Sequence, residues 1–201
     1  TWGIFCFILL YVVLPFFRCS MFGLAAGLAF IALLRYRRLI PYMLGGGLLL
    51  LLLPVAQTYI QRFIEGIQGQ DLATQMRFGE YQDALTLIGR YPIIGVGFAG
   101  TPDIDLYLGV ANVYLTIAQV MGIVGLLAFF AVIGTLFFYG LSHRHYFKAP
   151  EELDALWLGL HAASGGGLAA GLFDHYLFSL EFHHAVTAFW LLVGLATAVT
   201  R

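Results

Sequence analysis

The sequence has little charge for its length. Only 10% of its 201 residues are Asp, Glu, Lys or Arg, while 61% are hydrophobic and the mean hydropathy is +0.88. A water-soluble domain of this size cannot hide so much apolar surface in its core. The ten basic residues form no patch that could hold a nucleic-acid backbone. The composition therefore excludes a soluble domain and a nucleic-acid partner, and it indicates an integral membrane protein.

Cysteines are also scarce, since only Cys6 and Cys19 occur. They lack metal-ligand spacing, so we expect no metal site and interpret both as packing residues. The sequence starts at Thr1 and enters an apolar run at once, without the basic segment or the cleavage site of a signal peptide. We therefore expect a piece of a longer protein, with further membrane spans before it.

Long apolar runs make up most of the chain. A helix needs roughly 20 residues to cross a bilayer, where its backbone must satisfy its own hydrogen bonds. We predict an all-α polytopic bundle with transmembrane helices at residues 2–17, 20–34, 39–60, 112–140, 155–173 and 182–199. The chain is then one membrane domain in three parts, at residues 1–60, 61–111 and 112–201.

The basic residues orient this predicted bundle, because Lys and Arg concentrate on cytoplasmic joints. The basic joints are Arg35 to Arg38, Arg144 to Lys148, and Arg201. They follow every second predicted span, so these ends are predicted to lie inside. Arg18, residues 61–111 and the turn at residues 174–181 are then predicted to face outside. In a bacterium this is the extracytoplasmic side of the inner membrane.

The external segment at residues 61–111 is too long for a structureless connection. Its apolar residues recur at helical spacing: Leu72, Met76, Tyr81, Ala84, Leu85 and Ile88. With Asp71 or Thr74 as a cap, this pattern predicts an amphipathic helix that lies on the outer leaflet or packs over the bundle. Residues 91–103 are rich in Gly and Pro, and we expect them to return as a loop toward a helix near Asn112.

Residues 95–100 spell the pattern G-x-G-x-x-G. In a dinucleotide-binding protein this pattern follows a strand, opens a helix and precedes an acidic residue by about 20 positions. Here it lies between an interfacial helix and a membrane span. We therefore reject nucleotide binding and expect no cofactor.

Two external segments match motifs of a known family. Residues 77–85 (Arg-Phe-Gly-Glu-Tyr-Gln-Asp-Ala-Leu) resemble an R-x-x-x-W-x-x-A-[LM] helix, with Tyr81 in place of the tryptophan. Residues 90–97 (Arg-Tyr-Pro-Ile-Ile-Gly-Val-Gly) match a P-[IL]-[IL]-G-x-G turn. Both motifs are typical of the O-antigen ligase and polymerase family of bacterial membrane glycosyltransferases.

Further segments resemble the same family in the same order. Residues 111–115 and 121–127 are similar to H-N-x-[YF]-L followed by E-x-G-[IL]-x-G, with Ala111 in place of the histidine. Weaker similarities occur at residues 18–20, 173–176 and 189–195. The resemblance covers most of residues 70–195, and we interpret the chain as the C-terminal portion of a family member.

The resemblance implies a function. Members move a glycan from an undecaprenyl-diphosphate carrier to a hydroxyl acceptor at the outer face of the inner membrane, without metal or nucleotide. The implied partners are the lipid bilayer, the carrier-linked glycan and an acceptor that is either a lipid core or a growing polysaccharide. Ligase and polymerase differ only in this acceptor, and the sequence does not separate them.

A diphosphate leaving group calls for arginine, whose guanidinium meets phosphate oxygens in a bidentate manner. We predict that Arg77 neutralises the diphosphate, with Arg90 and Arg18 as helpers. The acceptor hydroxyl also needs a base. The family histidine corresponds to Ala111, so we name His175 or Asp174 as the base, with His183 and His184 also available. The remaining predicted substrate-binding residues are Tyr81, Asn112 and Tyr114.

Each candidate also has a structural explanation. Arg77 could pair with Glu80 on the helix surface, and Arg90 and Arg18 could extend to lipid headgroups. Asp174 and His175 could form a local cap. The other groups have default explanations at the membrane interface or in the bundle: His183, His184 and the tyrosines as interface residues, and His161 as a structural hydrogen-bonding group.

Two other functions stay open. A non-catalytic relative that binds lipid-linked glycan is favoured by Ala111, because alanine accepts no proton. A polytopic transporter of polysaccharide precursors would be favoured by paired charges or broken helices near the bilayer midplane. Within the predicted spans we find only His161 and no acidic partner for it.

Overall fold

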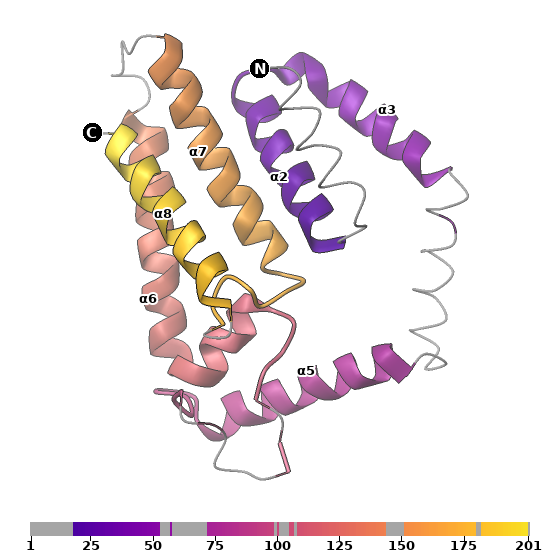
Figure 1. Ribbon diagram of the computed structural model, residues 1–201, viewed down its shortest axis with the longest axis vertical. Coiled ribbons are helices and arrows are strands. Elements are labelled where there is room, and N and C mark those ends of the chain that lie inside the picture. The colour runs from indigo at the N-terminus through magenta and orange to yellow at the C-terminus, as the bar shows by residue number, and fades with distance from the viewer. Residues whose placement is uncertain are drawn as a thin grey trace.

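The computed structural model describes residues 18–52, 57, 72–98, 100, 105–106, 108–143, 151–179 and 182–200. In these ranges every regular element is a helix, which confirms the all-α fold (Figure 1). The elements are α2 (Arg18–Leu34), the 3-10 helix η1 (Arg37–Leu39), α3 (Ile40–Leu51), α5 (Leu72–Arg90), α6 (Val113–His143), α7 (Glu151–Ala170) and α8 (His183–Val199). The predicted span at residues 2–17, Cys6, the basic joint at residues 144–148 and Arg201 lie outside the described residues.

One helix in the described ranges, α6, is both long enough and apolar enough to cross a membrane. Met21–Leu34 within α2 and the helix α8 are apolar but shorter. The predicted span at residues 39–60 is described as a helix over Ile40–Leu51, and most of its second half lies outside the described residues. The helices thus match the predicted positions, and the six-span bundle stays a prediction.

The helices α2 and α7 pack backbone to backbone through small residues. A Cβ atom added to Gly23 would lie 2.9 Å from the carbonyl oxygen of Gly166, and one added to Gly27 would lie 3.0 Å from that of Ala162. At the far end of this antiparallel pair, the side chains of Arg35 and Asp154 form an ion pair. Such close contacts between small residues are typical of helices that associate within a bilayer.

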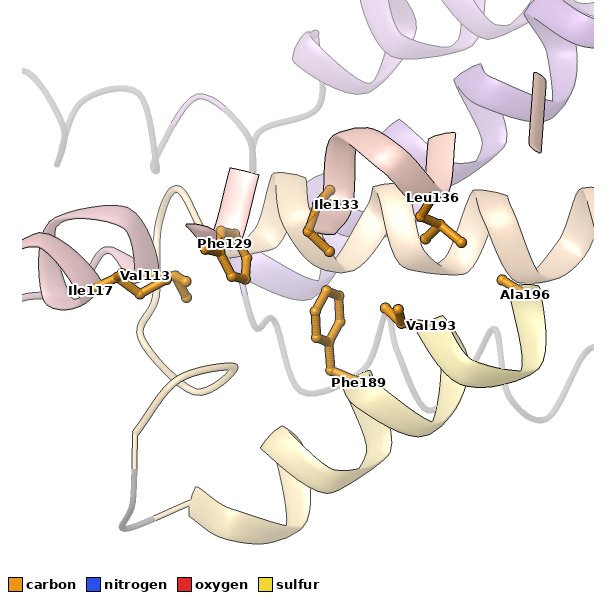
Figure 2. Close-up of a cluster of buried hydrophobic side chains, with 8 residues drawn as sticks. All are labelled: Val113, Ile117, Phe129, Ile133, Leu136, Phe189, Val193 and Ala196. Atoms are coloured by element: carbon orange, nitrogen blue, oxygen red, sulfur yellow. The ribbon is translucent and has the colours of Figure 1, made fainter. Parts of the chain in front are cut away.

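The main apolar core lies between α6 and α8, beside α7 (Figures 1 and 2). It contains Val113, Ile117, Phe129, Ile133 and Leu136 of α6 with Phe189, Val193 and Ala196 of α8. The order of these contacts makes α6 and α8 parallel, and α7 runs back between their ends. The beginning of α6, the end of α7 and the beginning of α8 therefore meet at one end of the bundle, as the predicted alternation requires.

The helix α6 is broken at Gly122, whose φ of 67° and ψ of −171° are not helical. The loop after α5 docks into this break. The N–H groups of Val96 and Gly97 donate to the carbonyls of Gln119 and Val120 at 2.8 and 2.9 Å, and the Ile123 N–H donates to the Pro92 carbonyl at 2.8 Å. The loop thereby satisfies backbone groups that the break leaves without helical partners.

Glycine is required on both sides of this contact. A Cβ atom on Gly95, whose φ is 74°, would lie 2.5 Å from the Val120 carbonyl carbon, and one on Gly122 would overlap the Ile93 carbonyl. Only glycine combines positive φ with such a close approach of two backbones. The Gly and Pro pattern correctly predicts a loop that returns toward α6, although its insertion into the helix is not evident from the sequence.

The helix α5 lies across the end of the bundle where α6 begins (Figure 1). Its range confirms a helix at the predicted place. Met76 and Leu85 are 63% and 60% exposed, whereas Ala84 and Leu87 are fully buried. The buried pair marks the side of α5 that packs on the bundle, and the contact of its apolar residues with the outer leaflet stays a prediction.

Candidate functional site

A cavity of about 450 Å³ lies at this end of the bundle, between α5, the loop before α6, the first turns of α6 and the turn after α7. Its chemistry comes from eight polar side chains: Arg77, Glu80, Thr116, Gln119, Asp174, His175, Tyr176 and Ser179. Phe98, Phe173 and Phe178 supply part of its apolar wall. The cavity therefore combines a cation, carboxyl groups, an imidazole and an amide with an apolar lining.

Arg77 and Glu80 come from α5, one turn apart, and both line the cavity. The surface salt bridge expected for residues three apart does not form between them, although both lie in the described part of the chain. The simplest structural explanation for Arg77 is therefore not what the structure shows. Its guanidinium borders a space large enough for a ligand group.

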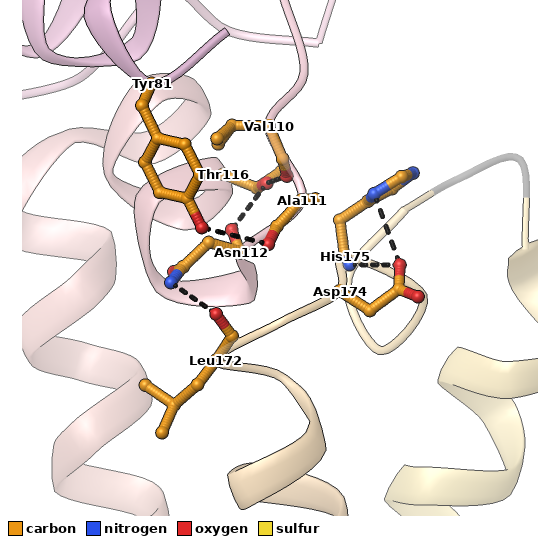
Figure 3. Close-up of polar contacts among 8 residues, drawn as sticks. All are labelled: Tyr81, Val110, Ala111, Asn112, Thr116, Leu172, Asp174 and His175. Carbon is orange, nitrogen blue, oxygen red and sulfur yellow. Dashed lines mark hydrogen bonds and ion pairs between the residues drawn. The ribbon is translucent and has the colours of Figure 1, made fainter. Parts of the chain in front are cut away.

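Asp174 and His175 lie in the turn that follows α7, across the cavity from α5 (Figure 3). The backbone N–H of His175 donates to Asp174 Oδ1 at 2.8 Å, so the predicted local cap exists. The same carboxyl oxygen is 3.5 Å from His175 Nδ1, which is an ion-pair distance once the ring is protonated. The ring also contacts Tyr176 and Phe182. The carboxylate thus fixes the backbone of its neighbour, while Nδ1 of the ring has no hydrogen-bond partner among the described residues.

Ala111 lines the cavity, and two predicted substrate-binding residues flank it (Figure 3). The Tyr81 hydroxyl donates to the Ala111 carbonyl at 3.4 Å. Asn112 caps α6, because its Oδ1 accepts the Leu115 N–H at 3.0 Å while its Nδ2 donates to the Leu172 carbonyl at 3.0 Å. These bonds fix the start of α6 against α5 and α7.

The cavity lining does not include Tyr114, Arg90, His183 or His184. The Tyr114 hydroxyl donates to the Leu168 carbonyl at 2.7 Å and joins α6 to α7. Arg90 is exposed at the last residue of α5, and Arg18 begins α2 at the same end of the bundle. The exposed His183 and His184 begin α8. The structure therefore brings together Arg77, Asp174 and His175, and among the candidates whose side chains it describes it leaves Arg90, Tyr81, Asn112, Tyr114, His183 and His184 outside the cavity lining.

The described ranges contain no group of three or more His, Cys, Asp or Glu side chains that could hold a metal ion. His161 lies elsewhere, buried in α7, with its Nδ1 2.9 Å from the Trp157 carbonyl and its ring packed on the Trp157 ring. It takes no part in the cavity.

A family model described as O-antigen ligase matches residues 3–130, which is more than half of the chain. The chain belongs to the O-antigen ligase family. Members of the O-antigen ligase family are bacterial inner-membrane proteins. No curated protein and no solved structure matches the chain.

The matched region contains Arg77, Ala111 and the break in α6, and it ends before Asp174 and His175. The structure gives a physical reason for three O-antigen ligase motifs recognised in the sequence. The first motif, at residues 77–85, brings Arg77 and Glu80 to the cavity, and residues 90–97 fill the helix break. The third, at residues 111–115 and 121–127, supplies the capped start of α6 and the glycine of the break. These segments are separate in sequence and meet at one place.

Three polar residues of the cavity, Thr116, Gln119 and Ser179, are not identified from the sequence. Thr116 donates to the Asn112 carbonyl at 2.9 Å, and Gln119 is 1% exposed. Asn112, Thr116 and Gln119 follow one another at intervals of four and three, so they share one face of a helix. A polar stripe at the start of an otherwise apolar span is the signal that could have revealed Thr116 and Gln119.

Proposed function

We propose that the protein transfers a glycan from an undecaprenyl-diphosphate carrier to a hydroxyl acceptor at the outer face of the bacterial inner membrane. The observation that carries this proposal is that Arg77 lines one cavity together with Asp174 and His175. The family membership supports the class of reaction. The acceptor is either a lipid core or a growing polysaccharide.

Arg77 is proposed to bind the diphosphate. When the bond between the sugar and the diphosphate breaks, the electron pair stays on the phosphate oxygen, and negative charge grows there. A guanidinium placed at that oxygen stabilises this charge more in the transition state than in the ground state. Arg77 suits this role because no ion pair to Glu80 occupies it in the described residues.

His175 is proposed to take the proton of the acceptor hydroxyl as its oxygen attacks the anomeric carbon. The Asp174 carboxylate lies 3.5 Å from Nδ1, so it can hold the ring and compensate the positive charge of the imidazolium. Ala111 and His175 line the same cavity. A base on the turn after α7 can therefore serve the space that the family histidine would otherwise occupy.

The surroundings of the cavity suit a lipid-linked donor. Phe98 lines it and is 57% exposed, and Ile93 and Ile94 of the docked loop are largely exposed too. Exposed apolar side chains beside a polar cavity give a polyprenyl chain a place to pack while its headgroup enters. This arrangement agrees with the predicted outer position of α5.

A second candidate is a non-catalytic protein that binds lipid-linked glycan. Ala111 is the specific observation that favours it, because the residue on the cavity wall at the family histidine position cannot move a proton. In this case Arg77 would retain its role in binding, and the protein would transfer no glycan.

The test measures glycan transfer by the purified full-length protein from an undecaprenyl-diphosphate-linked donor. Arg77→Ala should lower the transfer rate by about 100- to 1000-fold, as for loss of a charge-stabilising donor. His175→Ala should lower it by about 100-fold or more, while donor binding persists. Arg37→Ala and His143→Ala are matched controls at the opposite end of the bundle and should transfer at the normal rate.

The outcomes separate the two functions. Donor binding without transfer by the unmodified protein would support the non-catalytic binder. Normal transfer by Arg77→Ala would refute the proposed role of the cavity.

A further inference from the structure

The side chain of Gln119 lies in an unusual environment. It is 1% exposed, and neither Nε2 nor Oε1 has a hydrogen-bond partner among the residues that the structure describes. A buried polar group that gives up water without a protein partner costs free energy, and most such groups in proteins are paired. Gln119 also lines the cavity that holds Arg77 and His175. A residue that lines the cavity thus carries a buried amide without a protein partner.

The backbone holds Gln119 firmly in this position. Its carbonyl accepts the N–H of Val96 at 2.8 Å, at the point where the loop docks into the break of α6. One turn earlier, the Thr116 hydroxyl is engaged with the Asn112 carbonyl. The backbone that carries the amide is thus fixed by a contact between two segments, which limits the positions that the amide can reach.

The chemistry of the amide selects the kind of ligand. Nε2 only donates hydrogen bonds and Oε1 only accepts them. A diphosphate ionised at neutral pH has only acceptor oxygens, so it would leave Oε1 unsatisfied. A sugar hydroxyl both donates and accepts, and two adjacent hydroxyls can engage both ends of one amide. Only the glycan satisfies the whole group.

We propose that Gln119 binds adjacent hydroxyl groups of the sugar that is attached to the diphosphate, and thereby selects which glycan is transferred. This inference rests on the proposed function. The two residues then bind different parts of the donor, because Arg77 binds the diphosphate of every donor while Gln119 recognises the sugar. Gln119 is a specificity-determining residue and takes no part in proton transfer.

The test compares two probes for binding to the purified full-length protein. One is undecaprenyl diphosphate without sugar, and the other is undecaprenyl diphosphate with the native glycan, extracted from the producing cells. Gln119→Met keeps the length of the side chain and removes both polar atoms. It should weaken binding of the glycan-bearing probe by about 10- to 100-fold and leave binding of the sugar-free probe unchanged. Gln82→Met makes the same change at an exposed position of α5 and should alter neither.

Thermal unfolding distinguishes a binding role of Gln119 from a structural one, because the two roles predict different changes in the Tm of Gln119→Met. Removal of an unsatisfied buried amide should leave the Tm of Gln119→Met unchanged or raise it, because the folded protein loses no hydrogen bond. A fall in Tm would show that Gln119 supports the fold and would overturn the inference.

Failure of this inference differs from failure of the proposed function. If Gln119→Met bound both probes more weakly to the same extent, Gln119 would contact the diphosphate. If it bound both probes normally, Gln119 would contact no ligand. Either result overturns the role of Gln119 and leaves the transferase proposal intact. Absence of binding of both probes by the unmodified protein, with no effect of Arg77→Ala, would instead refute the proposed function.

Discussion

The contact between α2 and α7 and the cavity beside α5 differ in how they use close packing. In the first, Gly23, Gly27 and Gly166 bring two backbones together over their length. In the second, Gly95 and Gly122 also bring two backbones together, but they do so around a break that keeps polar side chains near an open space. The same residue type therefore closes one region and holds the other open. Substitutions at the first should change stability alone, and those at the second should change activity as well.

The largest effect is expected for Gly122→Ala. Its φ of 67° disfavours any side chain, and the added methyl group would overlap the Ile93 carbonyl. Backbone strain and overlap together should cost at least about 3 kcal/mol and displace the docked loop, so transfer should be lost along with stability. Thermal unfolding and the transfer assay measure the two losses.

Gly134→Ala is the matched control for this change, because nothing lies within 4 Å of the added atom in the same helix. It should leave transfer unchanged and raise stability by about 0.5 to 1 kcal/mol. Wild-type stability in Gly122→Ala would show that the loop does not occupy the helix break.

A smaller effect is expected for Gly166→Leu at the contact of α2 and α7. A Cβ atom there would lie 2.5 Å from the Gly23 carbonyl oxygen, so the helices must separate at a cost of about 1 to 3 kcal/mol. The Tm should fall, while the protein that stays folded should keep its affinity for donor. Gly159→Leu, in the same helix with nothing within 4 Å, should have the Tm of the unmodified protein. An equal fall in both variants would contradict the close packing.

The smallest effect is expected for Asn112→Ala. This change removes the N-cap of α6 and the bond to the Leu172 carbonyl, and it should lower stability by about 1 kcal/mol. Thr135→Ala is the control in α6, since its hydroxyl bonds only to a carbonyl of its own helix. If Asn112→Ala abolished donor binding at unchanged Tm, Asn112 would bind substrate as the sequence predicts.

Hydropathy and periodicity reveal the helical class and the positions of the helices, because both depend on local composition. The resemblance to the family identifies Arg77 as a candidate. Asp174 and His175 can be identified as a polar pair between two apolar runs. The break at Gly122 is hidden because glycine is common in apolar helices. Gln119 is hidden because its importance depends on which groups surround it.

Tertiary packing also supplies contacts that the sequence does not predict. The structure shows Asn112 and Tyr114 bonded to the carbonyls of Leu172 and Leu168, and their binding of substrate stays a prediction. The sequence names groups that can form hydrogen bonds, whereas the partner of each group depends on tertiary packing. The exposure of Met76 likewise depends on which part of α5 contacts the bundle, which periodicity cannot express.

The docked loop also decides between two forms of α6. The carbonyl of Gln119 and the N–H of Ile123 are four residues apart, so in an unbroken helix they would bond to each other. In the structure each has a separate partner in the loop, namely the Val96 N–H and the Pro92 carbonyl. The loop therefore holds α6 in its broken form, and with it the positions of Thr116, Gln119 and Val120 on the cavity wall.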